Sequence, residues 1–177
     1  MLKGGVDFVV GTLKARTVAF ISEDDQVIRE RATLLTSMLE AAGVKVVGSK
    51  FIQVGTTDVA SYLTKLKYQN PDVVFVNSGV MAFHFNLFEQ VATVGGWGNI
   101  KYFSLYSAGT DKSVMAEPAA EGSYRCVTWT PLLQNPGTAA FMNDFRTVLG
   151  RDADAINVYH NYCLRTAVEA IKIVWFG

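Results

Sequence analysis

The chain has 177 residues, enough for one domain with a full hydrophobic core, and hydrophobic residues make up 50% of it. Sixteen Lys and Arg residues balance sixteen Asp and Glu residues, so charge gives no reason to expect nucleic acid or an anionic membrane as a partner. No apolar run reaches about 18 residues, and the sequence therefore predicts no transmembrane helix.

The start of the chain poses a problem of connection. Residues 1–5 are too short and too polar for a secretory signal, so we expect no signal peptide in this chain. Residues 6–10 are rich in strand formers and predict a strand. Only residues 12–16 separate it from the next strand, which is too few for a parallel crossover. The first strand is therefore expected as an antiparallel neighbour, an edge strand placed elsewhere, or a remnant out of context.

From Thr17 onward, strands and helices alternate. Residues 18–21 form a short apolar run typical of a strand, and apolar residues then recur at helical spacing from Ile28 to Ala42. A second strand over 44–52 and a helix over 59–69 follow. This alternation favours a parallel sheet with helices packed over it.

The alternation continues to the end of the chain. Further strands are expected near 72–76, 101–105 and 123–128, and further helices near 81–94, 111–119, 138–149 and 155–174. The predicted fold class is α/β, a three-layer α/β/α sandwich with a mainly parallel sheet, whose strands are apolar because both faces are covered. The predicted buried set is Val18, Phe20, Leu35, Leu39, Leu63, Leu66, Val74, Val76, Phe88, Phe103, Phe145 and Ala167.

Small, polar and aromatic residues follow three of the predicted strands, at 22–25, 77–80 and 106–110. Ligands of open α/β sheets bind beyond the carboxyl ends of the strands, so these residues form a candidate site for a small polar molecule. Ordinary loop composition is the competing interpretation, because Gly, Ser, Asn and Asp are common in turns.

The sequence offers little support for catalysis. His84 and His160 have no partner at motif spacing and are expected as packed or surface histidines. We find no Gly-x-Ser-x-Gly elbow, no phosphate-binding loop and no metal-ligand spacing, so we expect no enzyme, no cofactor and no metal. Cys126 and Cys163 are expected as buried free thiols, with a disulfide as the alternative.

An acidic pair, Asp24 and Asp25, raises the alternative of a stand-alone signalling domain of the receiver type, or an enzymatic domain. A receiver also needs an aspartate ending a later strand and a lysine ending another, and Asn77 and Tyr106 occupy those places. The acidic pair is better explained as a cap of the helix that begins near Gln26.

Several segments together resemble a known family. They are Val-Ala-Phe-Ile-Ser-Glu-Asp-Asp at 18–25, Gly-Thr-Thr-Asp at 55–58, Lys-Leu-Lys-Tyr-Gln-Asn-Pro-Asp-Val-Val at 65–74, Ala-Glu-Gly at 120–122 and Tyr-His-Asn-Tyr at 159–162. In this order the chain resembles the type I periplasmic solute-binding proteins of ABC transporters for branched-chain amino acids, over about residues 16–174.

The resemblance implies a flavodoxin-like lobe from a protein with two lobes that enclose a ligand. Residues 14–177 look like the second lobe and residues 1–13 like a remnant strand of the first, most of which is absent. The implied function is non-catalytic binding of amino acids or related small carboxylates, in the periplasm or outside the cell. The implied partners are the ligand and the membrane components of the transporter.

The resemblance also implies the ligand contacts, which are Ser22, Glu23, Asp24, Val27, Asn77, Ser78, Gly79, Tyr106 and Ser107. Tyr106 stands where the family often has an acidic residue that holds the ligand ammonium. Without that acidic residue, the ligand ammonium loses a charge-assisted hydrogen bond worth about 1.5–3 kcal/mol. This admits aromatic or carboxylic acids as ligands. Alone, the chain is expected to bind such ligands very weakly or not at all, because a single lobe leaves a small ligand largely hydrated. It is also expected to form a homodimer or an exchanged-strand assembly with residues 1–16 at the contact, because a missing lobe leaves apolar surface and a sheet edge uncovered.

Overall fold

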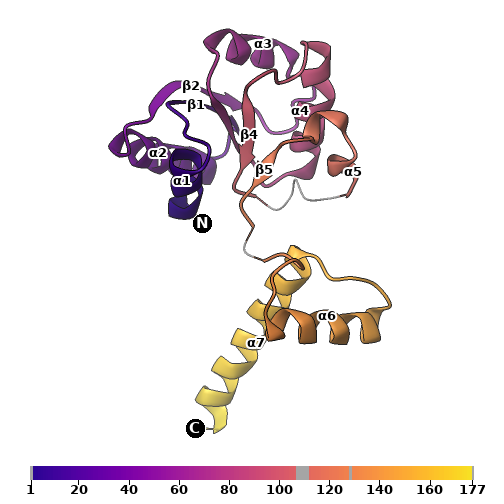
Figure 1. Cartoon of the computed structure of the whole chain (residues 1–177). Helices are drawn as coiled ribbons and strands as arrows, with labels where there is room; N and C mark the ends of the chain where they lie inside the picture. Colours follow the sequence, from indigo (N-terminus) through magenta and orange to yellow (C-terminus); the bar gives the residue numbers. More distant parts are fainter. Residues whose placement is uncertain (1, 107–111, 128, 177) are drawn as a thin grey trace. The chain divides into compact units, whose positions relative to one another are not determined.

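A computed structural model describes residues 2–106, 112–127 and 129–176, and its contacts divide the chain into two compact units. Unit 1 spans residues 1–126 and unit 2 spans residues 127–177 (Figure 1). The single lobe predicted over 14–177 stays a prediction, and the contacts of the chain place a division within it, between Cys126 and Val127. Each unit is therefore described by itself.

Unit 1 is built on a parallel sheet of five strands in the order β2-β1-β3-β4-β5. The strands are β1 Thr17–Glu23, β2 Lys45–Ile52, β3 Val73–Asn77, β4 Lys101–Ser104 and β5 Tyr124–Arg125. All five lie where the sequence predicted a strand, and their order is that of a flavodoxin-like sheet. The predicted α/β fold class is confirmed.

The central strands are buried on both faces, as expected for a covered parallel sheet. Every residue of β3 is buried, and Phe75 and Val76 have no exposed surface. Side chains alternate between two hydrophobic clusters, one on each face. Phe20 and Phe75 belong to one cluster, whereas Ile21 and Val76 belong to the other.

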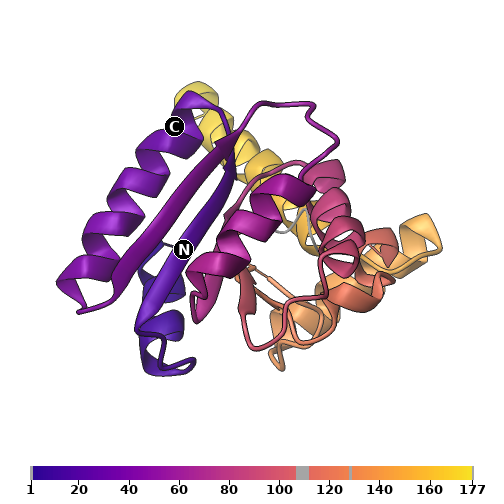
Figure 2. The ribbon, with the colours of Figure 1, turned by 90° about the horizontal axis from the view of Figure 1, so that it is seen from above.

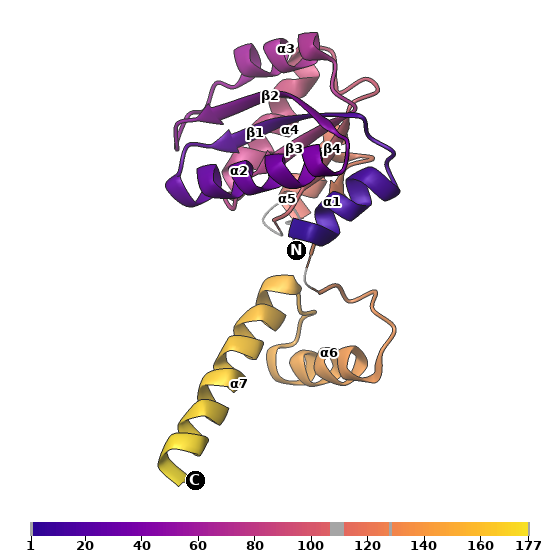
Figure 3. The same ribbon diagram turned by 90° about the vertical axis from the view of Figure 1, so that its left-hand side faces the viewer.

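Helices cover both faces. The cluster that holds Phe75 includes residues of α1 Leu2–Gly11 and α2 Gln26–Ala41. The cluster that holds Val76 includes residues of α3 Ala60–Gln69 and α4 Met81–Thr93. Figure 2 shows β1 and β2 between α2 and α3, and Figure 3 shows α2 and α3 on opposite faces. The short helices α5 Lys112–Met115 and η2 Pro118–Ala120 precede β5.

The predicted strand at residues 6–10 is wrong, because these residues lie in helix α1. Val6 and Val9 are buried in the same cluster as Phe103 and Leu105, so α1 is an integral part of unit 1. The ring of Phe8 stacks on Phe103 with centroids 5.8 Å apart. A helix can enter the neighbouring strand β1 through a short turn, which removes the problem of connection.

Unit 2 contains the helices α6 Pro136–Leu149 and α7 Ala155–Phe176. The side chain of Asn135 caps α6 by accepting a hydrogen bond from the Thr138 amide at 2.8 Å. Gly150 ends the helix in the left-handed conformation with φ 66°. Both helices were predicted from the sequence.

Two of the twelve residues predicted to be buried are not. Phe145 is only half-buried and Ala167 is exposed, because both lie on helices of the small unit 2, while the other ten lie in unit 1 and are buried. Both cysteines are free thiols, as expected, but Cys126 is half-buried and Cys163 is exposed. The expected burial of Cys163 is therefore wrong.

Candidate functional site

The carboxyl ends of β1, β3 and β4 bring most of the predicted site residues to one edge of the sheet. Ser22 of β1 is the register partner of Asn77 of β3, and β4 lies on the other side of β3. Glu23, Ser78 and Tyr106 follow at these ends, whereas Ser107 lies outside the described residues. The structure therefore juxtaposes three segments that are far apart in the sequence.

Four of the predicted contacts form a buried layer rather than an open surface. Ser22, Asn77 and Ser78 have no exposed surface, and Glu23 is 5% exposed. The Ser78 hydroxyl donates to the Glu23 carboxylate and accepts a hydrogen bond from the Val80 amide at 3.0 Å. This layer shapes the loops that carry the exposed residues.

Two buried oxygens of this layer lack a partner among the described residues, Ser22 Oγ and Asn77 Oδ1. The amide nitrogen of Asn77, by contrast, donates to the Ile28 carbonyl at 3.1 Å and ties β3 to α2. Buried polar atoms are almost always satisfied in folded proteins. Because both residues have no exposed surface, the two oxygens are expected to bind a buried water molecule.

His84 on α4 contacts the same edge through Ser78, although the sequence analysis expected only a packed or surface histidine. It is fully buried, its Nδ1 pairs with the Tyr102 hydroxyl, and its Nε2 lies 2.9 Å from the Ser78 carbonyl oxygen. This geometry fits the neutral ring in which Nε2–H donates to Ser78 and Nδ1 accepts from Tyr102. Burial lowers the pKa of His84 to about 4, with the Ser78 carbonyl opposing the shift and Arg125 adding to it.

Asp24, Asp25 and Val27 are exposed at the start of α2. Asp24 and Val27 were predicted ligand contacts, and Asp24 and Asp25 form the acidic pair. Asp25 caps α2 by accepting hydrogen bonds from the amides of Val27 and Ile28, at 2.9 and 3.3 Å, as the sequence predicted. Asp24 instead pairs with Arg29, whose hydrogen bond lowers the pKa of the Asp24 carboxyl. The Val27 side chain is 59% exposed.

Tyr106 is the aromatic residue at the edge, half-buried beside Gly79. Its hydroxyl accepts a hydrogen bond from Arg31 Nη1, and the guanidinium carbon of Arg31 lies 4.9 Å from the ring centroid. Burial raises the pKa of the Tyr106 hydroxyl, and the carboxylates of Asp25 and Glu23 add to the rise, while Arg31 opposes it. Charges from three other residues therefore act on this hydroxyl.

Sequence reasoning missed Arg31 and the supporting role of His84. A signal for Arg31 existed, since Arg31, Leu35 and Leu39 recur at i, i+4 and i+8 on α2, and both leucines are buried. A basic residue at the end of such an apolar stripe lies near the edge of the sheet. The partner, Tyr106, is 75 positions away and could not be read from the sequence.

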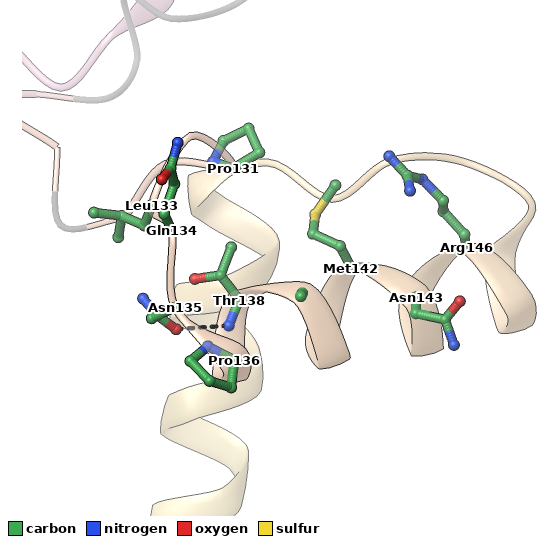
Figure 4. Close-up of a pocket in the computed structure, with 10 residues that line it drawn as sticks. Pro131, Leu133, Gln134, Asn135, Pro136, Thr138, Met142, Asn143 and Arg146 are labelled. Atoms are coloured by element: carbon green, nitrogen blue, oxygen red, sulfur yellow. Dashed lines mark hydrogen bonds between the residues drawn. The ribbon is translucent and has the colours of Figure 1, made fainter.

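A hollow in unit 2 is lined by residues of the 131–136 segment and of α6, among them Leu133, Thr138, Met142 and Arg146 (Figure 4). None of the predicted site residues lines this hollow. In the part of the chain that the structure describes, no cluster of His, Cys, Asp and Glu could hold a metal ion. Within the same residues, no helix has the length and hydropathy needed to cross a membrane.

Comparison with solved structures shows the fold. A leucine-binding protein from Thermotoga maritima is 16% identical with a TM-score of 0.76, over 88% of this chain and 44% of that protein. A solute-binding protein of an ABC transporter from Rhodopseudomonas palustris, in complex with 3,4-dihydroxybenzoic acid, is 18% identical with a TM-score of 0.75, over 97% of this chain and 47% of that protein. An ABC transporter substrate-binding protein from Sphaerobacter thermophilus is 22% identical with a TM-score of 0.70, over 81% of this chain and 40% of that protein.

The chain thus spans less than half the length of these solved relatives. No curated protein matches its sequence. The sequence model of the periplasmic binding protein family matches residues 1–172, nearly the whole chain. The chain therefore belongs to the periplasmic binding protein family.

Proposed function

We propose that this chain is the ligand-binding part of a solute-binding protein of an ABC transporter, and that it takes a small solute bearing a carboxylate. The observation that carries the proposal is that Tyr106 lies beside Gly79 where β3 and β4 end, next to the buried Ser22 and Asn77. The exposed Val27 lies at the start of α2, which follows the end of β1. An aromatic ring that carries a hydroxyl and an exposed apolar side chain together suit a small molecule with both apolar and polar parts.

The solved relatives support a carboxylate as the shared feature of the ligand. They include a leucine-binding protein and solute-binding proteins in complex with 3,4-dihydroxybenzoic acid, benzoate and 4-hydroxybenzoate. An amino acid and an aromatic acid have the carboxylate in common, and only the amino acid carries an ammonium. Tyr106 offers no negative charge for that ammonium, which favours the aromatic or aliphatic acids.

The biological setting follows from membership of the family. We infer that the chain works without catalysis or cofactor, in the periplasm or outside the cell, and delivers its solute to membrane components of a transporter. Unit 1 is the proposed second lobe. A single lobe leaves a small ligand largely hydrated, so we expect this chain alone to bind in the millimolar range or more weakly.

The structure of residues 1–16 does not support the self-association expected through them. Those residues were expected to present an unpaired strand, but they form α1, and its residues Val6 and Val9 are buried on the sheet of their own unit. A homodimer remains a proposal, and α7 is the element whose surface supports it.

The first prediction tests the site through Tyr106. Changing Tyr106→Ala removes the ring and the hydroxyl, and we expect the binding free energy of benzoate or L-leucine to weaken by about 1–3 kcal/mol, roughly 5- to 150-fold in Kd. Heteronuclear NMR titration at millimolar ligand measures both variants. The matched control is Tyr68→Ala in the last turn of α3, where the tyrosine is 93% exposed. An unchanged Kd in Tyr106→Ala removes Tyr106 from the site.

A further inference from the structure

Arg31 has a position that no other basic residue of α2 shares. Its side chain is half-buried, it donates to the Tyr106 hydroxyl, and its guanidinium carbon lies 4.9 Å from the Tyr106 ring centroid. Among the described residues, no carboxylate lies within 4.0 Å of its nitrogens. Arg31 is thus a cation held by an aromatic residue at the edge of the sheet, with most of its donors uncommitted.

Arg29, two residues earlier on the same helix, shows the contrasting case. Its Nε and Nη2 donate to the two carboxylate oxygens of Asp24, at 2.5 and 2.8 Å. Its guanidinium carbon lies 4.3 Å from the centroid of the Phe51 ring. The charge of Arg29 is therefore balanced by a neighbour, and its donors are largely used.

The start of α2 cannot supply the positive charge instead. The amides of Val27 and Ile28, which would otherwise face an anion, both donate to the capping carboxylate of Asp25. That carboxylate also opposes any second anion at the helix terminus. A ligand carboxylate near Tyr106 is left with Arg31 as its cationic partner on this helix.

The acidic residues nearby do not neutralise Arg31. The Glu23 carboxylate accepts a hydrogen bond from the Ser78 hydroxyl and is 5% exposed, and the Asp25 carboxylate accepts hydrogen bonds from two amides of α2. Both carboxylates act on Tyr106 through space. Their negative charges repel each anionic group of a ligand, so a ligand with one carboxylate fits this edge better than a ligand with several.

We propose that Arg31 is the residue that anchors the ligand carboxylate, positioned for this purpose by Tyr106. The guanidinium is a planar fork of donors that matches a carboxylate, and one arm of the fork is fixed by the tyrosine oxygen. Because Tyr106 accepts from Arg31, its own O–H proton remains to donate to the same carboxylate. Gly79 lies against the Tyr106 ring, where a Cβ atom would be 3.5 Å from Cδ1 and Cε1 of the tyrosine, so the absence of a side chain lets the ring lie close to the loop after β3.

This inference rests on the proposed function and is tested with the chain itself. The probes are benzoate, which carries only a carboxylate, L-leucine, which also carries an ammonium, and benzylamine, which carries only an ammonium. The variants are Arg31→Gln and Arg31→Lys, and the matched control is Arg29→Gln, which removes the same charge two positions away. Thermal unfolding first establishes that each variant is folded.

The readout is the NMR signal of the Arg31 side-chain Nε–H during titration, together with the Kd from backbone amides at the edge. We expect benzoate to shift the Arg31 signal and benzylamine to leave it unchanged. Arg31→Gln should weaken benzoate binding by about tenfold or more, since it loses a charge-assisted fork. Arg31→Lys should fall in between, because it keeps the charge without the fork, and Arg29→Gln should stay within about twofold of the wild type.

The outcomes separate this inference from the proposed function. If the wild type binds benzoate or L-leucine and both Arg31 variants bind equally well, the role of Arg31 is overturned while the site stands. If benzylamine shifts Arg31 as strongly as benzoate does, the role is also overturned. If no probe perturbs the edge at all, both proposals fail. If L-leucine binds better than benzoate and loses affinity in Arg31→Gln, the anchor is supported and the ligand is an amino acid.

Discussion

Ser78 is the residue on which the buried layer depends. Its hydroxyl contacts the Glu23 carboxylate and the Val80 amide, and its carbonyl accepts from His84. His84 in turn pairs with Tyr102 on β4. This one residue therefore joins the ends of β1 and β3 to α4 and β4, which fixes the loops that present Gly79 and Tyr106.

The buried His84 predicts a dependence of stability on pH. Its folded pKa of about 4 lies below the ordinary value of 6.5, so the folded state resists a proton that the unfolded state accepts. Its contribution is fully present above pH 6.5 and is lost as the pH falls from 6.5 to about 4. In this window the free energy of unfolding should fall by up to about 1.4 kcal/mol per pH unit from this group.

Urea unfolding at a series of pH values measures the effect. His84→Gln should lower stability at pH 7 and flatten the slope between pH 6.5 and 4. His160 is exposed on α7, so His160→Gln serves as the control and should leave the slope unchanged. A His84→Gln slope equal to that of the wild type would mean that the ring is already protonated or solvated in the folded state.

For single residues, the sequence predicted their place at the strand ends better than their burial and their contacts. Strand ends mark Ser22, Asn77 and Tyr106 as neighbours, because parallel strands end at one edge. It could not show that Ser22 and Asn77 are buried, since their burial depends on how α2 and the loop after β3 close over them. Nor could the sequence show that Tyr106 contacts Arg31, because this contact joins the residues after β4 to α2, 75 positions apart.

Helix α1 is the element on which sequence and structure differ. Residues 6–10 favour a strand by propensity, yet Leu2, Val6 and Val9 also recur at i, i+4 and i+7, and the last two are buried. Tertiary packing favours the helix over the strand, because the helical face formed by Val6 and Val9 covers Phe103 and Leu105. The alternating strands from β1 to β4 met no such competition, and their positions were predicted correctly.

Two adjacent glycines of α1 give opposite predictions for one substitution. A Cβ atom at Gly5 would lie 2.7 Å from Leu105 Cδ2 and 3.3 Å from Phe103 Cε1, whereas nothing lies within 4 Å of a Cβ atom at Gly4. Gly4→Ala should therefore stabilise unit 1 by about 0.5–1 kcal/mol through helix propensity. Gly5→Ala should lower stability by about 1–3 kcal/mol, because the methyl group overpacks the contact with β4.

Thermal or urea unfolding of the two single variants provides the measurement, and each variant is the control for the other. The change in helix propensity is the same at both positions, so the difference between them reports the packing of α1 on the sheet. Equal stabilisation by both substitutions would show that α1 does not pack on Leu105 in solution.

At the scale of the whole chain, the two units differ in what they bury. Unit 1 holds nearly all of the buried apolar residues among those described, whereas unit 2 buries Met142 and Ala153. The boundary between Cys126 and Val127 lies inside residues 123–128, which the sequence predicted as one strand, and for this reason no division was predicted there. Composition marks flexible linkers, but a division set by contacts alone is invisible to it.

Helix α7 leads to the last prediction, which concerns self-association. Leu164, Val168, Ile171 and Trp175 follow one another at helical spacing and are not covered by the rest of unit 2, and on another face neither are Tyr162 and Ile173. A helix that is apolar on several faces is normally buried, and exposed apolar surface of this extent favours association.

We expect light scattering to give a mass above the 19.4 kDa of one chain, rising with concentration. The double change Val168→Lys and Ile171→Lys should return it to the monomer. Val54→Lys with Tyr68→Lys, at exposed positions of unit 1, adds the same charge and should leave the association intact. A wild-type chain that stays monomeric at high micromolar concentration would contradict this role of α7.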